Sequence, residues 1–196
     1  VLMAKPAPAP PERIALSLCD GMGCCALALQ RIDAEIDRYI AVEIDETAKY
    51  VAQASNPEAH GFPGIDHSWH SDVLSITETD VVALGKGTIK LLAFGAPCED
   101  MSKLRLLKSR NSGGNTHGDP RPGLNGPKGS VFRACLQVTL WVLRHNPECD
   151  LFIENVDFSD MKADWAEVCA ALGTPLVINA ANYSYTKRNR AYWTTF

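Results

Sequence analysis

Residues 13–32 read RIALSLCDGMGCCALALQRI, and this stretch decides the fold. It predicts an apolar strand over residues 13–19, a tight turn at Asp20-Gly21-Met22-Gly23 and a helix over residues 24–32. A strand, a glycine turn and a helix in this order are typical of a parallel α/β sheet. Ligands of such sheets bind beyond the carboxyl ends of the strands, so the turn is a candidate binding position.

Short β-rich runs and helical patterns alternate over the rest of the chain, which favours an α/β fold with a mostly parallel sheet. A second strand is predicted over residues 38–43, and a short third strand is predicted to end near Asp72-Val73. Further strands are predicted over residues 89–95, 151–153, 176–179 and 191–196. Helices are predicted over residues 46–54, 77–85, 130–145 and 159–172. In the third of these helices one face carries Phe132, Cys135, Leu136, Leu140 and Leu143. We expect the strand order 3-2-1-4-5 plus a terminal antiparallel pair, because the last connection, residues 180–189, is short.

The composition is that of one globular domain. The chain has 196 residues, of which 46% are hydrophobic and 21% charged, and this is enough for a sizeable core. No apolar run approaches the roughly 20 residues that span a bilayer, so no membrane partner is expected. Residues 1–12 are rich in Pro and Ala and begin without Met, so we expect a flexible lead-in cut from a longer chain. The domain is then expected over residues 13–196.

Seven cysteines occur without any Cys-x-x-Cys pair, and several of them lie in apolar stretches. An odd number in this arrangement favours free thiols in a reducing compartment over a disulfide framework or a zinc site. His60, His67 and His70 are close in sequence, but a solvated loop explains them better than a metal site does. No metal is therefore expected.

The net charge of −4 does not by itself suggest nucleic acid, but its distribution does. Residues 101–133 carry +6 and leave −10 for the rest of the chain, the basic residues being Lys103, Arg105, Lys108, Arg110, Arg121, Lys128 and Arg133. Taken alone, this pattern is explained best by a solvated basic loop. A glycine-rich cationic loop also suits a phosphate backbone. We expect residues 99–128 to be mobile without DNA and to become ordered over the substrate.

Four predicted strands end in marked polar or tight-turn residues: Asp20-Gly21-Met22-Gly23, Glu43, Asp72 and Pro97-Cys98. A glycine turn lets the backbone approach a ligand, and an acid after the next strand can accept hydrogen bonds from ribose hydroxyls. An Asp after the third strand could accept from an adenine amino group. Each signal is weak alone, since such turns and acids also occur without ligands. Together they indicate a nucleoside-type cofactor.

Three further motifs follow in order: Pro97-Cys98, Glu154-Asn155-Val156 and Arg188-Asn189-Arg190. With the Asp-Gly turn they resemble the motifs of the DNA cytosine-C5 methyltransferases, most closely the animal de novo branch. The similar stretches are LSLCDGMG (16–23), DRYIAVEID (37–45), SDVLSIT (71–77), FGAPCEDMS (94–102), GLNGPKGSVF (123–132), FIENV (152–156) and RNRAYW (188–193).

The resemblance implies a Rossmann-like, S-adenosylmethionine-dependent methyltransferase fold that acts on a cytosine flipped out of DNA. It implies that Cys98 adds to C6 of the base, that Glu154 holds the N3 edge and that Arg190, supported by Arg188, contacts the cytosine. A lowered pKa would help Cys98 to act at neutral pH. The implied cofactor residues are Cys19, Asp20, Gly21, Met22, Gly23, Glu43, Asp72, Val73 and Pro97. The implied substrate residues are Ser102, Asn155, Arg188 and Arg190.

DNA is the expected partner, with a protein partner or a second copy of the chain also possible. The location is then intracellular, in the nucleus of a eukaryote or the cytoplasm of a bacterium or phage. Two features depart from the family. Cys19 stands where the family usually has an aromatic residue that stacks on adenine, which implies weaker stacking. The sequence stops at Phe196, so the target-recognition region and the last motif are expected to be absent.

Three functions stay open. The first is an active DNA methyltransferase, and the second is a catalytically inactive, methyltransferase-like accessory protein. The retained Cys98, Glu154 and Arg190 argue against the second, whereas Cys19 leaves it open. The third is tRNA methylation, which ranks below DNA because the chain has no Cys-Phe-Thr segment of the kind that marks that branch.

Overall fold

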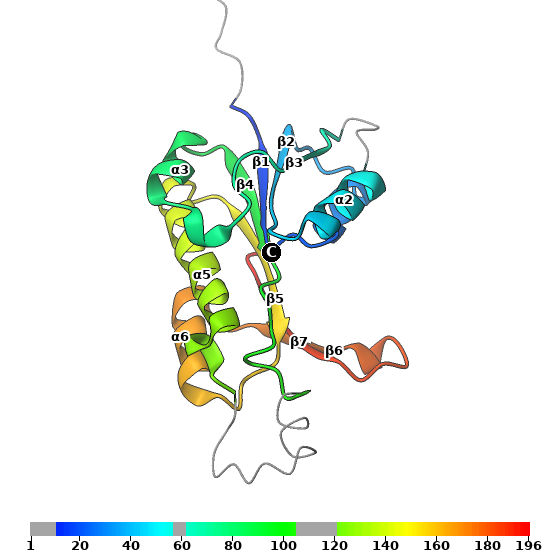
Figure 1. Ribbon diagram of the computed structural model, residues 1–196, viewed down its shortest axis with the longest axis vertical. Coiled ribbons are helices and arrows are strands. Elements are labelled where there is room, and N and C mark those ends of the chain that lie inside the picture. Colours follow the sequence, from blue (N-terminus) through cyan, green and yellow to red (C-terminus); the bar gives the residue numbers. More distant parts are fainter. Residues whose placement is uncertain (1–10, 57–61, 105–120) are drawn as a thin grey trace, which may run out of the picture.

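A seven-stranded sheet organises the chain in the computed structural model, which describes residues 11–56, 62–104 and 121–196. The strand order is β3-β2-β1-β4-β5-β7-β6 (Figure 1). The strands from β3 to β5 are parallel, and β7 is antiparallel to both β5 and β6. Their bounds are β1 Ile14–Leu18, β2 Arg38–Val42, β3 Ile65–Asp66, β4 Ile89–Phe94, β5 Asp150–Val156, β6 Leu176–Asn179 and β7 Asn189–Thr194. The predicted α/β class, strand order and terminal antiparallel pair are confirmed.

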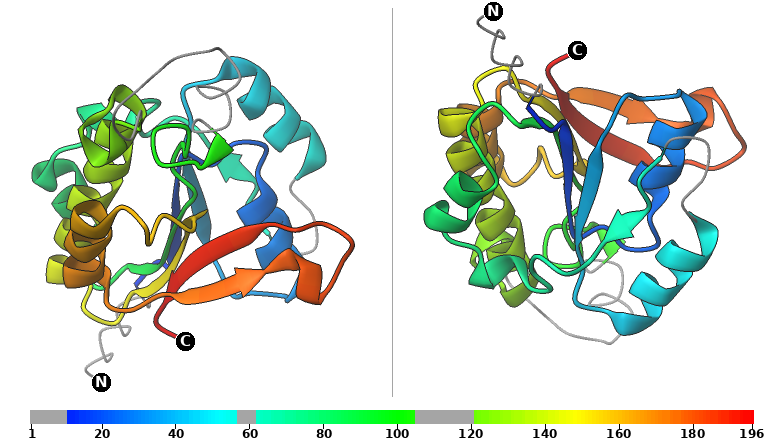
Figure 2. Two further views of the ribbon diagram at one scale, coloured as in Figure 1. Left: turned by 90° about the horizontal axis from the view of Figure 1, so that it is seen from below. Right: turned by 90° about the horizontal axis from the view of Figure 1, so that it is seen from above.

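Helices cover both faces of the sheet. Figure 2 shows α3, α5 and α6 on one face and α1 and α2 on the other. Their bounds are α1 Cys24–Arg31, α2 Glu46–Ser55, α3 Glu78–Ala83, α5 Pro127–His145 and α6 Lys162–Leu172, with short 3₁₀ helices η1 Val73–Ser75, η2 Gly123–Asn125 and η3 Ala180–Asn182. Among the described residues, no helix is both long and apolar enough to cross a membrane.

The central strand β1 is buried along its whole length, as expected for a parallel strand with helices on both faces. Its larger side chains, such as Leu16 and Leu18, belong to the main core beneath α3, α5 and α6. The opposite face of the sheet carries the smaller residues Ala15 and Ala41, which pack with Ala26 of α1. Small residues on this face let α1 approach the sheet closely, directly after the glycine turn.

Helix α5 begins earlier than predicted, and its buried face differs from the predicted one at Leu140. Pro127 occupies its first turn, where the missing N–H costs nothing, so the helix starts three residues before the predicted start. Phe132, Cys135 and Leu136 are buried as predicted. Leu140 was predicted on the same face but is 41% exposed, because the buried stripe continues through Thr139 and Val142 instead.

The predicted third strand was wrong. Residues near Asp72 form no strand; β3 is the short Ile65–Asp66 pair, where no strand was predicted. Asp72 is instead the N-cap of η1, with its side chain accepting the N–H of Leu74 at 2.9 Å. The short β3 sits between proline, glycine and histidine residues, which hid its strand pattern. Most of the predicted mobile loop, residues 105–120, lies outside the described residues.

Candidate active site

One cavity of about 550 Å³ lies at the carboxyl ends of the parallel strands. Its wall combines residues predicted for the cofactor with residues predicted for catalysis. Nine predicted residues line it: Cys19, Glu43, Asp72, Val73, Pro97, Cys98, Glu154, Arg188 and Arg190. The two predicted groups therefore share one continuous space.

The acids on the cofactor side of the cavity are held by backbone N–H groups. The carboxylate of Glu43 accepts the N–H of Gly21 at 2.8 Å and that of Asp45 at 2.9 Å. The Asp72 carboxylate accepts the N–H of Leu74 at 2.9 Å. These contacts hold both carboxylates at the cavity wall.

The predicted glycine turn lies beside the cavity without lining it, since Asp20, Gly21, Met22 and Gly23 are absent from its wall. The Asp20 carboxylate faces inward and accepts the Tyr39 hydroxyl at 2.6 Å. Burial raises the pKa of the Asp20 carboxyl, while hydrogen bonds from Ser17 and Tyr39 oppose that shift. Gly23 has a φ of 76°, and a Cβ there would lie 2.7 Å from Asn56 Nδ2, so the turn needs glycine to pack against α2.

Cys19 directly follows β1 and lines the cavity, with its backbone in the left-handed region at a φ of 52°. Its Sγ lies 3.8 Å from Sγ of Cys135 on α5. The side chain at this position is thus a small thiol packed toward the helix, with no ring to offer a flat ligand.

Cys98 follows β4 at the start of a tight turn over residues 98–102, here named the Cys98 turn. The Cys98 carbonyl accepts the N–H groups of Met101 at 3.0 Å and Ser102 at 2.8 Å. Burial raises the pKa of the half-buried Cys98 thiol above its ordinary value. The Arg190 guanidinium opposes that shift, and the carboxylates of Glu99 and Glu154 add to it. The structure thus gives the opposite direction to the lowered pKa that would favour a thiolate.

Glu154 and Arg190 form an ion pair across the antiparallel β5–β7 ladder. Arg190 Nε lies 2.5 Å from Glu154 Oε1, and the two side chains are 16% and 30% exposed. Arg190 also donates to the Asn189 carbonyl at 3.0 Å. The strand β7 begins at Asn189, two residues earlier than predicted, so Arg190 is a strand residue opposite Val156. This register places the guanidinium beside the carboxylate in the cavity.

The remaining predicted substrate residues have different surroundings. Asn155 is buried: its Nδ2 donates to the Ala96 carbonyl at 3.0 Å and its Oδ1 accepts the N–H of Val156 at 2.8 Å. It ties the end of β4 to β5 and does not line the cavity. Ser102 and Arg188 line an adjoining groove of about 580 Å³ that also includes Cys98. That groove carries the basic residues Lys103, Lys187, Arg188 and Arg190.

Sequence reasoning missed three residues around the Cys98 turn. Lys128 lines the cavity, and the buried Asp100 accepts the N–H groups of Lys128 at 2.8 Å and Gly129 at 3.3 Å. Asp160 pairs with Arg121, which the sequence suggested for phosphate contact. The glycines of GLNGPKG were the available signal: a Cβ at Gly129 would lie 2.0 Å from the Gly123 carbonyl oxygen. Only glycine permits this close approach at the start of α5.

Two comparisons with known proteins agree with this arrangement. A family model described as C-5 cytosine-specific DNA methylase matches residues 14–157. The crystal structure of the S. pombe Dnmt2 methyltransferase is similar to this chain, with a TM-score of 0.56 and 21% sequence identity over 92% of this chain. The likeness covers 47% of that structure's chain, so the present chain spans about half its length, and at this identity it shows the fold alone. A comparison with curated proteins found no match.

Proposed function

The chain belongs to the C-5 cytosine-specific DNA methylase family, and on that basis we propose that it methylates C5 of cytosine in DNA through a Cys98–C6 bond. The observation that carries the proposal is the single cavity in which Cys98 and the Glu154–Arg190 pair meet Glu43 and Asp72. A thiol, an acid with a basic partner and a pair of fixed acids are the groups that this reaction needs.

The proposed methyl donor is S-adenosylmethionine, and the acids at the cavity wall fit its polar groups. Glu43 would accept hydrogen bonds from the ribose hydroxyls, and Asp72 would accept from the adenine amino group, with Val73 against the ring. Cys19 offers no aromatic face for the ring. When bound, this cofactor supplies an electrophilic methyl group on its sulfonium. Asp20 contributes through the shape of the turn, since its carboxylate is bonded to Tyr39.

Cys98 starts the proposed reaction at the cytosine. Its thiolate adds to C6, and the electron pair of the C5–C6 double bond moves through the ring so that C5 becomes nucleophilic. Glu154, carrying a proton, meets the negative charge that builds at N3, by donating a hydrogen bond or by giving that proton to N3. Arg190 keeps Glu154 oriented and contacts the base. After C5 has received the methyl group, a base removes the C5 proton, the double bond re-forms and Cys98 leaves.

Substrate binding also relieves the raised pKa of Cys98. The Glu154 carboxylate is one of the groups that raise it, and Arg190 is the group that lowers it. A proton shared between the Glu154 carboxyl and N3 of a bound cytosine would neutralise that negative charge, while the positive charge of Arg190 would remain. Proton uptake of this kind would favour the Cys98 thiolate once the base is in place.

DNA is the proposed substrate over tRNA. The description of the matching family supports this choice, as does the absence of a Cys-Phe-Thr segment. The basic groove beside Cys98 suits a phosphate backbone on either side of a flipped base. The stretches at 94–102 and 123–132 support affiliation with the de novo branch. We propose that residues 13–196 form the catalytic core. Because the proposed substrate is DNA, we also propose a location in the nucleus of a eukaryote or in the cytoplasm of a bacterium or phage.

Cys98→Ser tests the function in the complete gene product. A serine hydroxyl is scarcely ionised at neutral pH, so methyl transfer to a cytosine-containing duplex should fall on the order of a thousandfold or more. The melting temperature should stay within about 2 °C, because the site is only half buried. Cys24→Ser is the matched control: this exposed thiol lies outside the cavity and should change neither quantity.

Two outcomes would contradict the proposal. Wild-type turnover in Cys98→Ser would exclude the covalent mechanism. A wild-type protein that binds cofactor but methylates neither DNA nor tRNA would instead be an accessory protein.

A further inference from the structure

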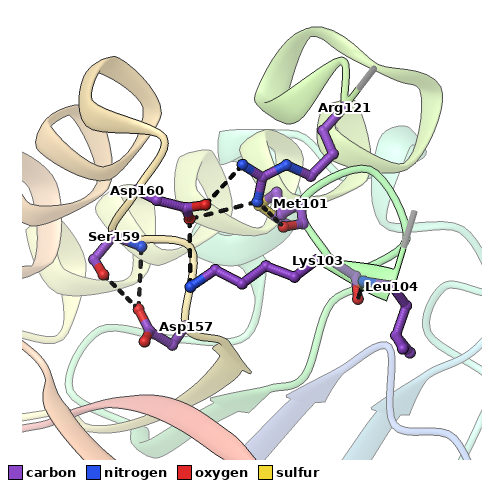
Figure 3. Close-up of polar contacts among 8 residues, drawn as sticks. Met101, Lys103, Leu104, Arg121, Asp157, Ser159 and Asp160 are labelled. Atoms are coloured by element: carbon purple, nitrogen blue, oxygen red, sulfur yellow. Dashed lines mark hydrogen bonds and ion pairs between the residues drawn. The ribbon is translucent and has the colours of Figure 1, made fainter. Parts of the chain in front are cut away.

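A buried arginine connects the Cys98 turn to the segment that follows Glu154. Figure 3 shows Arg121 between the Met101 carbonyl and the Asp160 carboxylate. Arg121 donates to Met101 O at 3.1 Å and to the two oxygens of Asp160 at 3.4 and 2.9 Å. We name these three residues the Arg121 bridge. It joins the segment that follows β4, which contains Cys98, to the segment that follows β5, which contains Glu154.

Burying the Arg121 guanidinium costs desolvation free energy, which its bonds in the bridge must offset. The Arg121 side chain is only 2% exposed, and a buried guanidinium is tolerated only where its donors are bonded. A planar guanidinium can bind a carboxylate and a carbonyl together in fixed directions, which lysine cannot do. The bonds of Arg121 therefore restrict the position of Met101 relative to Asp160.

The Asp160 end of the bridge is itself fixed. Asp157 accepts the N–H of Ser159 at 3.1 Å and its hydroxyl at 2.7 Å, which closes the turn just before Asp160 (Figure 3). Lys103 Nζ lies 3.7 Å from Asp160, so a second cation from beyond the Cys98 turn meets the same carboxylate. The Asp160 carboxylate thus pairs with two cationic side chains, Lys103 and Arg121.

The other side of the Cys98 turn is held by helix α5. The Asp100 carboxylate accepts N–H groups in the first turn of α5, where the N-cap, Gly126, supplies no side-chain bond. An anion at a helix N-terminus is favoured by the helix dipole. The Asp100 carbonyl also accepts the N–H of Gly123 at 3.1 Å. With one side held by α5, the Arg121 bridge joins the turn itself to the segment after β5.

We propose that Asp160, acting through Arg121, is a positioning residue that sets Cys98 at the correct place relative to Glu154. The chain of contacts is short: Met101 bonds Cys98 through its N–H and Arg121 through its carbonyl. A misplacement of about 1 Å at a reacting atom can cost on the order of a hundredfold in rate. The role rests on the proposed function, because Cys98 must attack a base that Glu154 holds.

Asp160→Asn tests the Arg121 bridge in the complete gene product. It keeps the shape of Asp160 and removes its charge. Its matched control is Glu167→Gln, because Glu167 pairs with Arg133 at 2.8 Å and is similarly exposed, at 47% against 40%, but does not reach the Cys98 turn. Arg121→Lys is the second variant. It keeps the positive charge but loses the planar guanidinium, which binds the carboxylate and the carbonyl together.

Two readouts separate positioning from general stability. For Asp160→Asn we expect kcat to fall about 10- to 100-fold, with the KM for DNA and cofactor changed less than about twofold. Hydrogen exchange at the Met101 and Ser102 amides, which bond Cys98, should quicken at least about tenfold. Arg121→Lys should show the same pattern more weakly. Asp160→Glu, which restores the charge, should recover part of kcat, and Glu167→Gln should change neither readout.

Wild-type kcat in Asp160→Asn, or unchanged exchange at both amides, overturns the role of Asp160. A loss of kcat matched by Glu167→Gln overturns it as well, since both would then reflect lost stability. A wild-type protein that methylates neither DNA nor tRNA overturns the proposed function itself, and the catalytic role of the bridge with it. In that case the exchange rates still show whether Asp160 orders the turn.

Discussion

The two sides of the cavity are built in different ways. On the cofactor side, the carboxylates are held by backbone N–H groups: Glu43 by Gly21 and Asp45, and Asp72 by Leu74. On the catalytic side, the side chains hold one another, as in the Glu154–Arg190 pair. Backbone contacts persist when a neighbouring side chain is changed, whereas a pair of side chains fails together. Residues of the cofactor side should therefore act independently, and those of the catalytic side as a unit.

The largest expected effect lies on the catalytic side. Glu154→Gln and Arg190→Ala should each lower kcat about 10²- to 10³-fold, because one removes the group that meets charge at N3 and the other its partner. The double variant should be scarcely worse than either single one, since the two act as a pair. Methyl transfer to a duplex measures all three. Losses that multiply would show that the ion pair does not act as a unit.

Glu43→Ala should have a smaller effect, confined to cofactor binding. Loss of charge-assisted hydrogen bonds should weaken the binding of S-adenosylhomocysteine by about 1.5–3 kcal/mol in a calorimetric titration. Catalysis at saturating cofactor should be unchanged. Combined with Glu154→Gln, the two losses should simply add. Unchanged affinity in Glu43→Ala would remove this residue from the cofactor site.

The glycines of the two sides should differ in what they contribute to stability. Gly129→Ala would push a Cβ to 2.0 Å from a backbone oxygen, so we expect a loss of about 2–3 kcal/mol. Gly23→Ala meets the end of the Asn56 side chain at 2.7 Å and also strains a left-handed backbone, for a loss of about 1–2 kcal/mol. Urea denaturation measures both losses. Equal stability of Gly129→Ala and wild type would contradict the close packing at the start of α5.

The smallest effect concerns the titration of Cys98. Because burial raises its pKa, alkylation by iodoacetamide should rise with pH later than that of free cysteine. Glu99→Gln removes a nearby negative charge, so the pKa should fall and alkylation at a fixed pH below it should quicken. Arg190→Ala removes the positive charge and should shift the profile to higher pH. Identical profiles in the three proteins would mean that these charges do not act on the thiol.

The contrast between the two sides also decides what could be predicted from the sequence. Glu43 follows a strand directly, as the local pattern indicated. Asp72 was predicted from a strand that does not form, and it caps η1 instead. The Asp20 carboxylate accepts a hydrogen bond from Tyr39 on the neighbouring strand, a contact that no local pattern indicated. The strand order followed from the alternation of elements, while the two-residue β3 was too short to leave a pattern.

The catalytic side depends on contacts between distant segments. Asp100 meets Lys128 and Arg121 meets Asp160, and no periodicity links such pairs. Arg121 and Arg133 were counted as candidates for phosphate contact, yet each is paired with a carboxylate. The amino-acid composition shows that a residue is charged, but it does not show which residue of opposite charge it pairs with. The roles of Cys98, Glu154 and Arg190 came from the resemblance to a family. The motifs of that family identify residues that are far apart in the sequence but share one site, which local periodicity does not do.

Covalent trapping tests the central proposal, the bond between Cys98 and C6, most directly. A fluorine at C5 cannot leave as the proton does, so the methylated adduct cannot release Cys98. With S-adenosylmethionine, the complete gene product should form a denaturation-resistant adduct with a 5-fluorocytosine duplex, and peptide mass analysis should place it on Cys98. A 5-fluorocytosine-containing tRNA should give none. An adduct with tRNA alone, on another cysteine, or with neither nucleic acid would contradict the proposed function.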